Sequence, residues 1–269
     1  MCKAGTSMAK TIFGKMLPFL IFLMIWQAMA LMIQANRHVA FPTPWEVGQT
    51  LAALVSGAPL SEAPLIRHIG DSLLRWLAGF GIAAVCGTFY GLLAGWSRGF
   101  RNATLPILHV LQLIPGLAWI PVAILCFGIG EAATVSMIAI TAFTPIALNV
   151  LSGVQQLDET YLRAARMMGA RGKTLLLRVL LPGALPATIS GLRIGLGNGW
   201  RVLVAAEMVV GTGTGLGYAI IEARWTLDYA SAFSCIGIIC LIGLLVERLL
   251  FKPLEERTIA KWYLTGDDA

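Results

Sequence analysis

Three charged residues interrupt an apolar run in the C-terminal half of this 269-residue chain. The run spans Gly183–Val210, and Arg193, Arg201 and Glu207 lie within it. A charge at the centre of a bilayer costs about 2.5–3.5 kcal/mol, so such side chains should face water or a partner. Asn198 precedes Arg201 by three residues, which places both on one helix face. Such a pair facing a cavity could attract an anion, and we predict Asn198, Arg201 and Glu207 as candidate pathway residues.

A structural ion pair is the alternative interpretation of these charges. Arg201 could pair with Glu207 or with Glu131, which lies at the edge of another apolar run. Arg201 and Glu207 are six residues apart, about 120° around a helix, so a bond between them within one helix is not expected. Gln112, Trp119 and Asn149 are further candidates for lining a pathway.

Motifs for enzymatic chemistry are incomplete. Gly172-Lys173-Thr174 resembles the end of a phosphate-binding loop, but the full pattern needs a glycine where this chain has Met167. No H-E-x-x-H zinc motif occurs, and the three histidines are scattered along the sequence. We therefore predict that the chain is not an enzyme, hydrolyses no ATP itself, and needs no metal or cofactor.

The composition indicates which elements position these side chains. Hydrophobic residues make up 57% of the chain, charged residues 13%, and the mean hydropathy is +0.77, whereas soluble domains carry about a quarter charged residues. A spanning helix needs roughly 20 mostly apolar residues. The sequence predicts an all-α polytopic membrane protein, a single domain over residues 1–269 with a core at about 72–252. Six spans are predicted: Met16–Gln34, Trp76–Trp96, Asn102–Gly130, Ala132–Leu157, Gly183–Val210 and Tyr229–Val246.

The positive charges orient the predicted spans. With the N-terminus inside, the cytoplasmic segments hold 14 of the 20 lysines and arginines, the outer segments hold four, and the fifth span holds two. Lysine and arginine concentrate on the cytoplasmic side of membrane proteins. We expect both termini to be cytoplasmic, and we attribute the net charge of +6 to this rim rather than to nucleic-acid binding.

The segment between the fourth and fifth spans predicts a compact helix–turn–helix. Asp158 is a favourable N-cap, and Glu159 places negative charge in the first turn. Gly169 stands where a left-handed glycine ends a helix, and a second short helix, about Lys173–Leu181, ends at Pro182. The segment is cationic with an apolar stripe, which favours docking in a groove of another protein.

This segment resembles the EAA loop of bacterial ABC importer permeases. The family pattern is E-A-A, three residues, Gly, nine residues, and Ile-x-Leu-Pro. This chain has Ala164-Ala165, three residues, Gly169, nine residues, and then Val179-Leu180-Leu181-Pro182. It departs from the pattern at Arg163, which replaces the usual Glu, and at Val179. The phrases "FPTPWEVGQTLAAL", "LPILHVLQLIPGLAWIPVAILCFGIGE" and "VAAEMVVGTGTGLGYAI" are similar to the nitrate, sulfonate, taurine and bicarbonate branch of that family.

The resemblance implies a permease subunit of an ATP-driven importer in the bacterial inner membrane. Two permease copies would form the pore within the lipid, and two ATPase subunits would drive it. A periplasmic binding protein would deliver a small solute, expected to be an anion such as nitrate, sulfonate or taurine. The coupling loop, at about residues 158–182, would contact the ATPase through Asp158, Glu159, Arg163, Ala164, Ala165, Gly169, Leu181 and Pro182.

Two glycine repeats predict close helix packing. Glycines spaced by four residues let helix backbones approach within a bundle or across a seam between two copies. Pro115, Pro121 and Pro145 predict kinks in the third and fourth spans. The repeats comprise Gly87, Gly91 and Gly95 in the second span, and Gly191, Gly195 and Gly199 in the fifth.

An autonomous carrier or channel for small anions is the alternative function. A proton-coupled carrier usually has acidic or histidine side chains within several spans. Glu207 is the only acidic residue within a predicted span, which favours a half-transporter that needs other chains.

Overall fold

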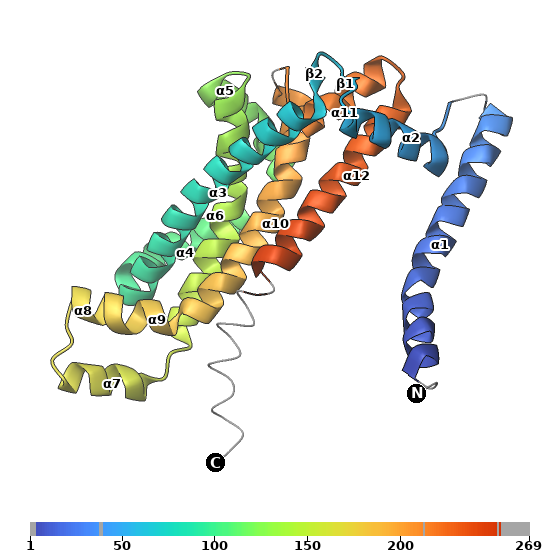
Figure 1. Cartoon of the computed structure of the whole chain (residues 1–269). Helices are drawn as coiled ribbons and strands as arrows, with labels where there is room; N and C mark the ends of the chain where they lie inside the picture. Colours follow the sequence, from blue (N-terminus) through green and yellow to red (C-terminus); the bar gives the residue numbers. More distant parts are fainter. Residues whose placement is uncertain (1–3, 38–39, 212, 252, 254–269) are drawn as a thin grey trace. The chain divides into compact units, whose positions relative to one another are not determined.

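A computed structural model describes residues 4–37, 40–211, 213–251 and 253, most of them helical (Figure 1). Lys3, Lys252, Arg257 and Lys261, which contributed to the predicted orientation, lie outside these residues. The helices are α1 (Ala4–Arg37), α2 (Pro44–Val55), α3 (Leu65–Trp96), α4 (Arg98–Leu113), α5 (Ile120–Phe127), α6 (Glu131–Gln155), α7 (Glu159–Met167), α8 (Lys173–Leu175), α9 (Leu181–Gly183), α10 (Leu185–Val210), α11 (Leu216–Trp225) and α12 (Tyr229–Val246). Shorter elements are the 3₁₀ turn η1 (Gly116–Trp119), the π-helical turns η2 (Leu176–Leu180) and η3 (Glu247–Phe251), and the antiparallel strands β1 (Pro59–Leu60) and β2 (Ala63–Pro64).

Four helical stretches are long and apolar enough to cross a membrane. They are Met16–Arg37, Leu65–Trp96, Glu131–Gln155 and Tyr229–Leu249. Two bent helix pairs raise the number to six if each pair counts as one span. The predicted all-α polytopic membrane fold is confirmed.

The predicted third span bends sharply just before Pro115, one of the prolines expected to kink it. α4 and the following stretch Gly116–Phe127 meet at 104°. Proline disfavours helical backbone in the residue before it, and Ile114, which precedes Pro115, is extended at φ −78° and ψ 117°. A second bend, of 65°, separates Lys173–Gly183 from α10, and α10 is the helix that corresponds to the predicted fifth span.

The chain divides into two compact units, residues 1–65 with 219–237, and residues 66–218 with 238–269. The single domain expected for residues 1–269 stays a prediction. Each unit has local structure that its sequence explains.

In the first unit, α2 begins with a capping box. The N–H of Glu46 donates to Thr43 Oγ1 at 3.3 Å, and the N–H of Thr43 donates to the Glu46 carboxylate at 2.8 Å. Trp26 donates its indole N–H to the carbonyl of Pro42 at 3.1 Å, and its ring stacks on Phe233 with centroids 5.6 Å apart. These contacts join α1 to the start of α2 and to α12.

In the second unit, α6 packs against α3 and α10 (Figure 1). A Cβ at Gly91 of α3 would lie 2.5 Å from Val150 Cβ, and one at Gly195 of α10 would lie 2.7 Å from Ile146 Cγ1. Both glycine repeats therefore pack within the chain, against α6. Gly87, Gly91 and Gly95 face Ile146, Val150 and Val154, whereas Gly191, Gly195 and Gly199 face Asn149, Ile146 and Ile138.

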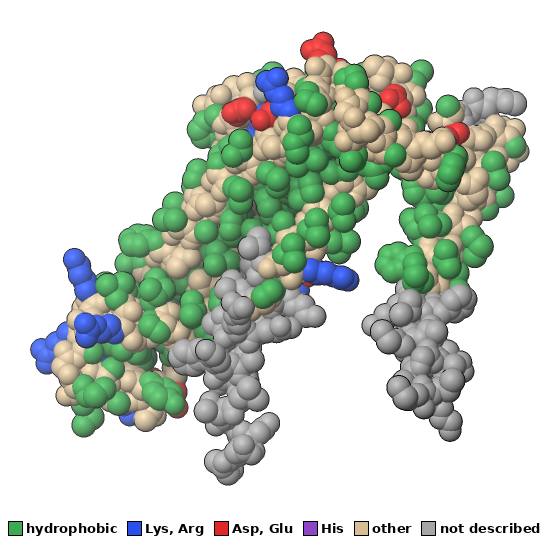
Figure 2. Space-filling view, in the orientation of Figure 1, with side chains coloured by type: hydrophobic (Ala, Val, Ile, Leu, Met, Phe, Trp, Pro, Cys, Tyr) green, Lys and Arg blue, Asp and Glu red, His purple; other side chains and the backbone are tan. Residues whose placement is uncertain are grey.

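The surface of the second unit separates apolar from basic side chains. Apolar side chains cover its flank, and lysines and arginines gather at the end that carries α7 and α8 (Figure 2). Leu74, Val85 and Phe89 of α3 are among the exposed apolar residues. An apolar flank of this kind is compatible with contact to lipid chains or to another helix.

Candidate functional site

The α7–α9 segment (residues 158–183) projects from the end of the second unit as two short helical arms (Figure 1). Asp158 caps α7 by accepting the N–H of Thr160 at 2.7 Å. This hydrogen bond lowers the pKa of the exposed Asp158 carboxyl below its usual value. Gly169 ends the first arm at φ +85°, in the left-handed region that favours glycine. The first arm and its turn therefore follow the local sequence signals.

The second arm does not end at Pro182 as predicted. α8, η2 and α9 continue through Gly183, and Pro182 lies in the first turn of α9. Proline is tolerated there because the first-turn N–H groups have no partner within the helix. Leu162 of the first arm and Leu181 of the second both pack against the core of the second unit. The two arms are thus fixed at their apolar sides.

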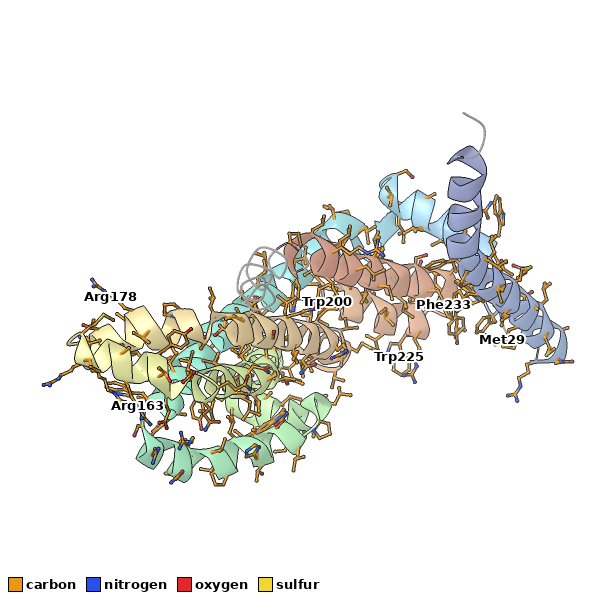
Figure 3. The ribbon with its side chains drawn as sticks, turned by 90° about the horizontal axis from the view of Figure 1, so that it is seen from below. Met29, Arg163, Arg178, Trp200, Trp225 and Phe233 are labelled. Carbon is orange, nitrogen blue, oxygen red and sulfur yellow. The ribbon has the colours of Figure 1, made fainter. Side chains whose placement is uncertain are left out.

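The outer face of the α7–α9 segment is basic and partly apolar. Arg163 pairs with Glu159 one turn earlier, and this hydrogen bond lowers the pKa of the exposed Glu159 carboxyl. Arg163 and Arg178 extend from the two arms (Figure 3). Met167 and Met168 are 88% and 83% exposed at the turn. Exposed methionines are common on surfaces that bind several partners, because the side chain is flexible and polarizable. Ala165 is buried, whereas Ala164 is exposed.

The polar residues of α10 separate into two environments. Arg201 is exposed and donates to Asn198 Oδ1 at 2.5 Å. Glu207 lies six residues further along, and its side chain has no exposed surface. Arg193 pairs with Glu247 at 2.5 Å. Arg201 and Asn198 come together as predicted, but Glu207 does not join them.

Two cavities border Arg201. The larger, about 500 Å³, lies between α10 and the end of α12, with Trp76, Trp200 and the Arg193–Glu247 pair in its wall. The smaller, about 340 Å³, lies at the bend between α4 and α5, and we call it the bend cavity. Asn198 also borders both. Cavities of this size match those that bind small ligands. Of the other predicted pathway liners, Gln112 and Trp119 border the bend cavity.

A buried polar network encloses Glu207. Arg75 of α3 donates to Glu207 at 3.0 Å and to Glu131 at 3.2 Å, so one arginine binds both acids that were considered as partners of Arg201. Ser72 Oγ donates to the Glu207 carboxylate at 2.8 Å, and the N–H of Gly217 donates to it at 2.9 Å. These bonds satisfy the buried charge, as burial requires.

The same network holds the glycine-rich turn after α10. Arg75 donates to the carbonyl of Thr214 at 2.8 Å, and the N–H of Gly215 donates to His68 Nδ1 at 3.1 Å. Gly215 has φ +130°, and a Cβ there would lie 2.6 Å from the Glu207 carboxylate. Glycine is therefore required where the turn closes over the acid.

The sequence analysis missed this network, although one signal was present. His68, Ser72 and Arg75 are spaced by four and three residues, which is one face of a helix. They were assigned to an outer loop because the second span was predicted to begin at Trp76, whereas α3 begins at Leu65. The network lies at the end of α10 opposite the α7–α9 segment.

Comparison with solved structures supports the fold. Each match is below 25% identical in sequence, so it shows the fold alone. An inward-facing structure of the MetNI methionine ABC transporter has a TM-score of 0.60 at 22% identity, covering 69% of this chain and 92% of that chain. An amino acid ABC transporter solved with histidines gives 0.55 at 20% identity, covering 81% and 99%.

Sequence relatives identify the family. The taurine transport system permease protein TauC of Escherichia coli is 33% identical, over 90% of this chain and 87% of its own length. The aliphatic sulfonates permease SsuC of Bacillus subtilis is 32% identical over 93% and 87%, and the nitrate import permease NrtB of Synechocystis is 31% identical over 86% and 83%. Residues 87–258 match the family described as binding-protein-dependent transport system inner membrane component. The chain therefore belongs to this family, the membrane-spanning permease subunits of ABC importers.

Proposed function

We propose that this permease imports a small anion and that separate ATPase subunits drive it through the α7–α9 segment. A periplasmic binding protein delivers the solute, and two copies of the chain, surrounded by lipid, enclose the pathway. The observation that carries the proposal is the basic, methionine-tipped surface of this segment, which is fixed to the core beside α10. The relatives named for taurine, sulfonates and nitrate support the solute class.

The attachment of the segment supports the proposed coupling role. α9 runs directly into α10, with only Ala184 between them. Leu181 of α9 and Leu162 of α7 pack on the core that also contains Ile146 and Val150 of α6. A displacement of the docked arms is therefore transmitted to α6 and to α10, the helix that carries Arg201. Asp158, Glu159, Arg163, Ala164, Ala165, Gly169, Leu181 and Pro182 are the residues that we assign to this coupling.

The orientation follows from the same assignment. The α7–α9 segment faces the cytoplasm, where the ATPase is found, and both termini lie on that side. The Arg75–Glu207 network then lies at the opposite, outer end of α10, together with the glycine-rich turn. The basic end in Figure 2 is the cytoplasmic rim.

Gly169→Asp tests the coupling role. The left-handed backbone at Gly169 penalises any side chain, and the added acid opposes docking of a basic surface. We expect membrane insertion to be unchanged, the ATPase to be lost from pull-downs in detergent, and ATP-driven uptake in proteoliposomes to fall at least tenfold. Gly99→Asp is the matched control, because Gly99 is exposed in the first turn of α4 and a Cβ there meets nothing within 4 Å.

Two outcomes would contradict the proposal. A Gly169→Asp variant that retains the ATPase and normal uptake would remove the coupling role. Uptake that persists without any ATPase would instead support the autonomous carrier.

A further inference from the structure

The bend cavity contains polar side chains from three separate parts of the second unit. Gln112 comes from the end of α4, Thr141 and Thr144 from α6, and Asn198 and Arg201 from α10. η1, which follows the 104° bend, contributes Gly116 and Trp119 to the lining of this cavity. No aspartate or glutamate lies among the described residues of its lining, so Arg201 gives the cavity a net positive charge.

The positive charge of Arg201 is not neutralised by an acid in the structure. Among the described residues, no carboxylate lies within ion-pair distance of Arg201, and its partner is the neutral Asn198. Asn198 uses Oδ1 to accept from Arg201, which leaves its amide N–H groups available to donate. An exposed arginine within a spanning helix requires water or an anionic partner.

Thr141 supplies an independent observation. Its Oγ1 is buried and has no hydrogen-bond partner in the described part of the chain. Most buried hydroxyls are satisfied, so an exception in a cavity wall needs an explanation. Thr144, also in the wall, is already satisfied, since its Oγ1 donates to the carbonyl of Ile140 at 3.5 Å. Thr141 therefore lines the bend cavity and carries a hydroxyl that no described group satisfies.

We propose that the bend cavity is an anion-selecting subsite on the translocation pathway. Arg201 binds the negative charge of a monovalent oxyanion, a nitrate or sulfonate group, and Thr141, Asn198 and Gln112 donate to its oxygen atoms. The larger cavity is less suited to binding an anion, because Glu247 in its wall forms an ion pair with Arg193 and its negative charge repels an anion. This inference rests on the proposed import function and specifies which side chains select the solute.

Uptake by the complete transporter tests the subsite. The permease with its ATPase and binding protein is reconstituted in proteoliposomes, and uptake of taurine and of nitrate is measured together with ATP hydrolysis. We expect Arg201→Gln to lower uptake at least tenfold and Thr141→Val, which keeps the side-chain shape, to lower it three- to fivefold. Binding-protein-stimulated ATP hydrolysis should change less than twofold in both variants, so that ATP consumed per solute rises.

Thr188→Val is the matched control for the hydroxyl. Thr188 is buried on α10 and donates to the carbonyl of Ala184 at 2.9 Å, outside either cavity. Solute uptake by the Thr188→Val transporter should stay within twofold of uptake by the unsubstituted transporter. If Thr141→Val and Arg201→Gln also stay within twofold, the subsite is refuted. If the unsubstituted transporter shows no ATP-driven uptake of any solute, the proposed function fails instead.

Iodide quenching tests the subsite without transport. Trp119 lines the bend cavity. Its fluorescence is obtained by subtracting the emission of the Trp119→Phe variant from that of the unsubstituted full-length protein, both in nanodiscs. We expect Arg201→Gln to lower the iodide quenching constant of Trp119 at least twofold at constant ionic strength. Quenching by neutral acrylamide should not change. Equal effects on the two quenchers, or no effect on iodide, would show that the cavity does not concentrate anions.

Discussion

Glu207→Ala should destabilise the protein more than any exposed glutamate substitution. Glu207 is fully enclosed and Arg75 has a side chain that is only 5% exposed. Removing one partner of a buried ion pair costs about 3–5 kcal/mol, because the other charge stays buried. With roughly 2–4 °C per kcal/mol for a chain of this size, the midpoint of thermal denaturation should fall by roughly 6–20 °C. Glu207→Gln should also be destabilising, because it removes the same negative charge and turns a donor NH2 group toward either Arg75 or the N–H of Gly217.

Glu131→Ala is the control, because Glu131 bonds the same arginine from the surface. Its side chain is 70% exposed, so the pair is worth about 0–1 kcal/mol. The assay heats the detergent-solubilised protein and follows the fraction that stays monodisperse in size-exclusion chromatography. A Glu207→Ala midpoint within about 2 °C of the unsubstituted protein, which corresponds to at most about 1 kcal/mol, or an equal loss in Glu131→Ala, would refute the reasoning. In the double variant Arg75→Met with Glu207→Leu, the fall in the denaturation midpoint should be smaller than the sum of the falls in the two single variants.

Three further predictions concern helix packing and helix ends. Gly91→Val should prevent close packing and abolish the folded peak in size-exclusion chromatography, whereas Gly81→Ala on the same helix, where a Cβ meets nothing within 4 Å, should be neutral or slightly stabilising. Thr43→Ala should remove the N-cap of α2 and lower the stability of that helix by about 1 kcal/mol. The loss should appear as faster amide exchange in α2, and unchanged exchange would contradict the role of the cap. Because its pKa is lowered, Asp158 stabilises α7 above a pH of about 4, and this stabilisation is lost as the pH falls through the lowered pKa. Asp158→Ala should therefore speed amide exchange of residues 159–167 at pH 6 but have little effect once the pH lies below the lowered pKa of Asp158, and an equal effect under both conditions would contradict the assignment.

The sequence predicted elements whose signals are local. Asp158 and Gly169 fixed the ends of the first arm because an N-cap and a left-handed glycine act on their own backbone. The apolar runs located the spans for the same reason, since each helix satisfies its backbone within its own segment.

Features that depend on partners distant in the sequence were not predicted. Glu207 was assigned to a pathway because no sequence signal joins it to Arg75 on another helix. Pro115 signalled a kink, but the 104° angle depends on how η1 packs, including the close approach of Gly116 to Val202. The glycine spacing predicted close packing, and only the geometry showed that α6 is the partner of both repeats.

The position of Ile146 determines where this protein can deform. A Cβ at Gly87 of α3 would lie 2.9 Å from Ile146 Cγ2, and one at Gly195 of α10 would lie 2.7 Å from its Cγ1. Sliding of either helix along α6 would drive this branched side chain into a backbone. The three helices must therefore turn as one block, and any hinge lies outside them.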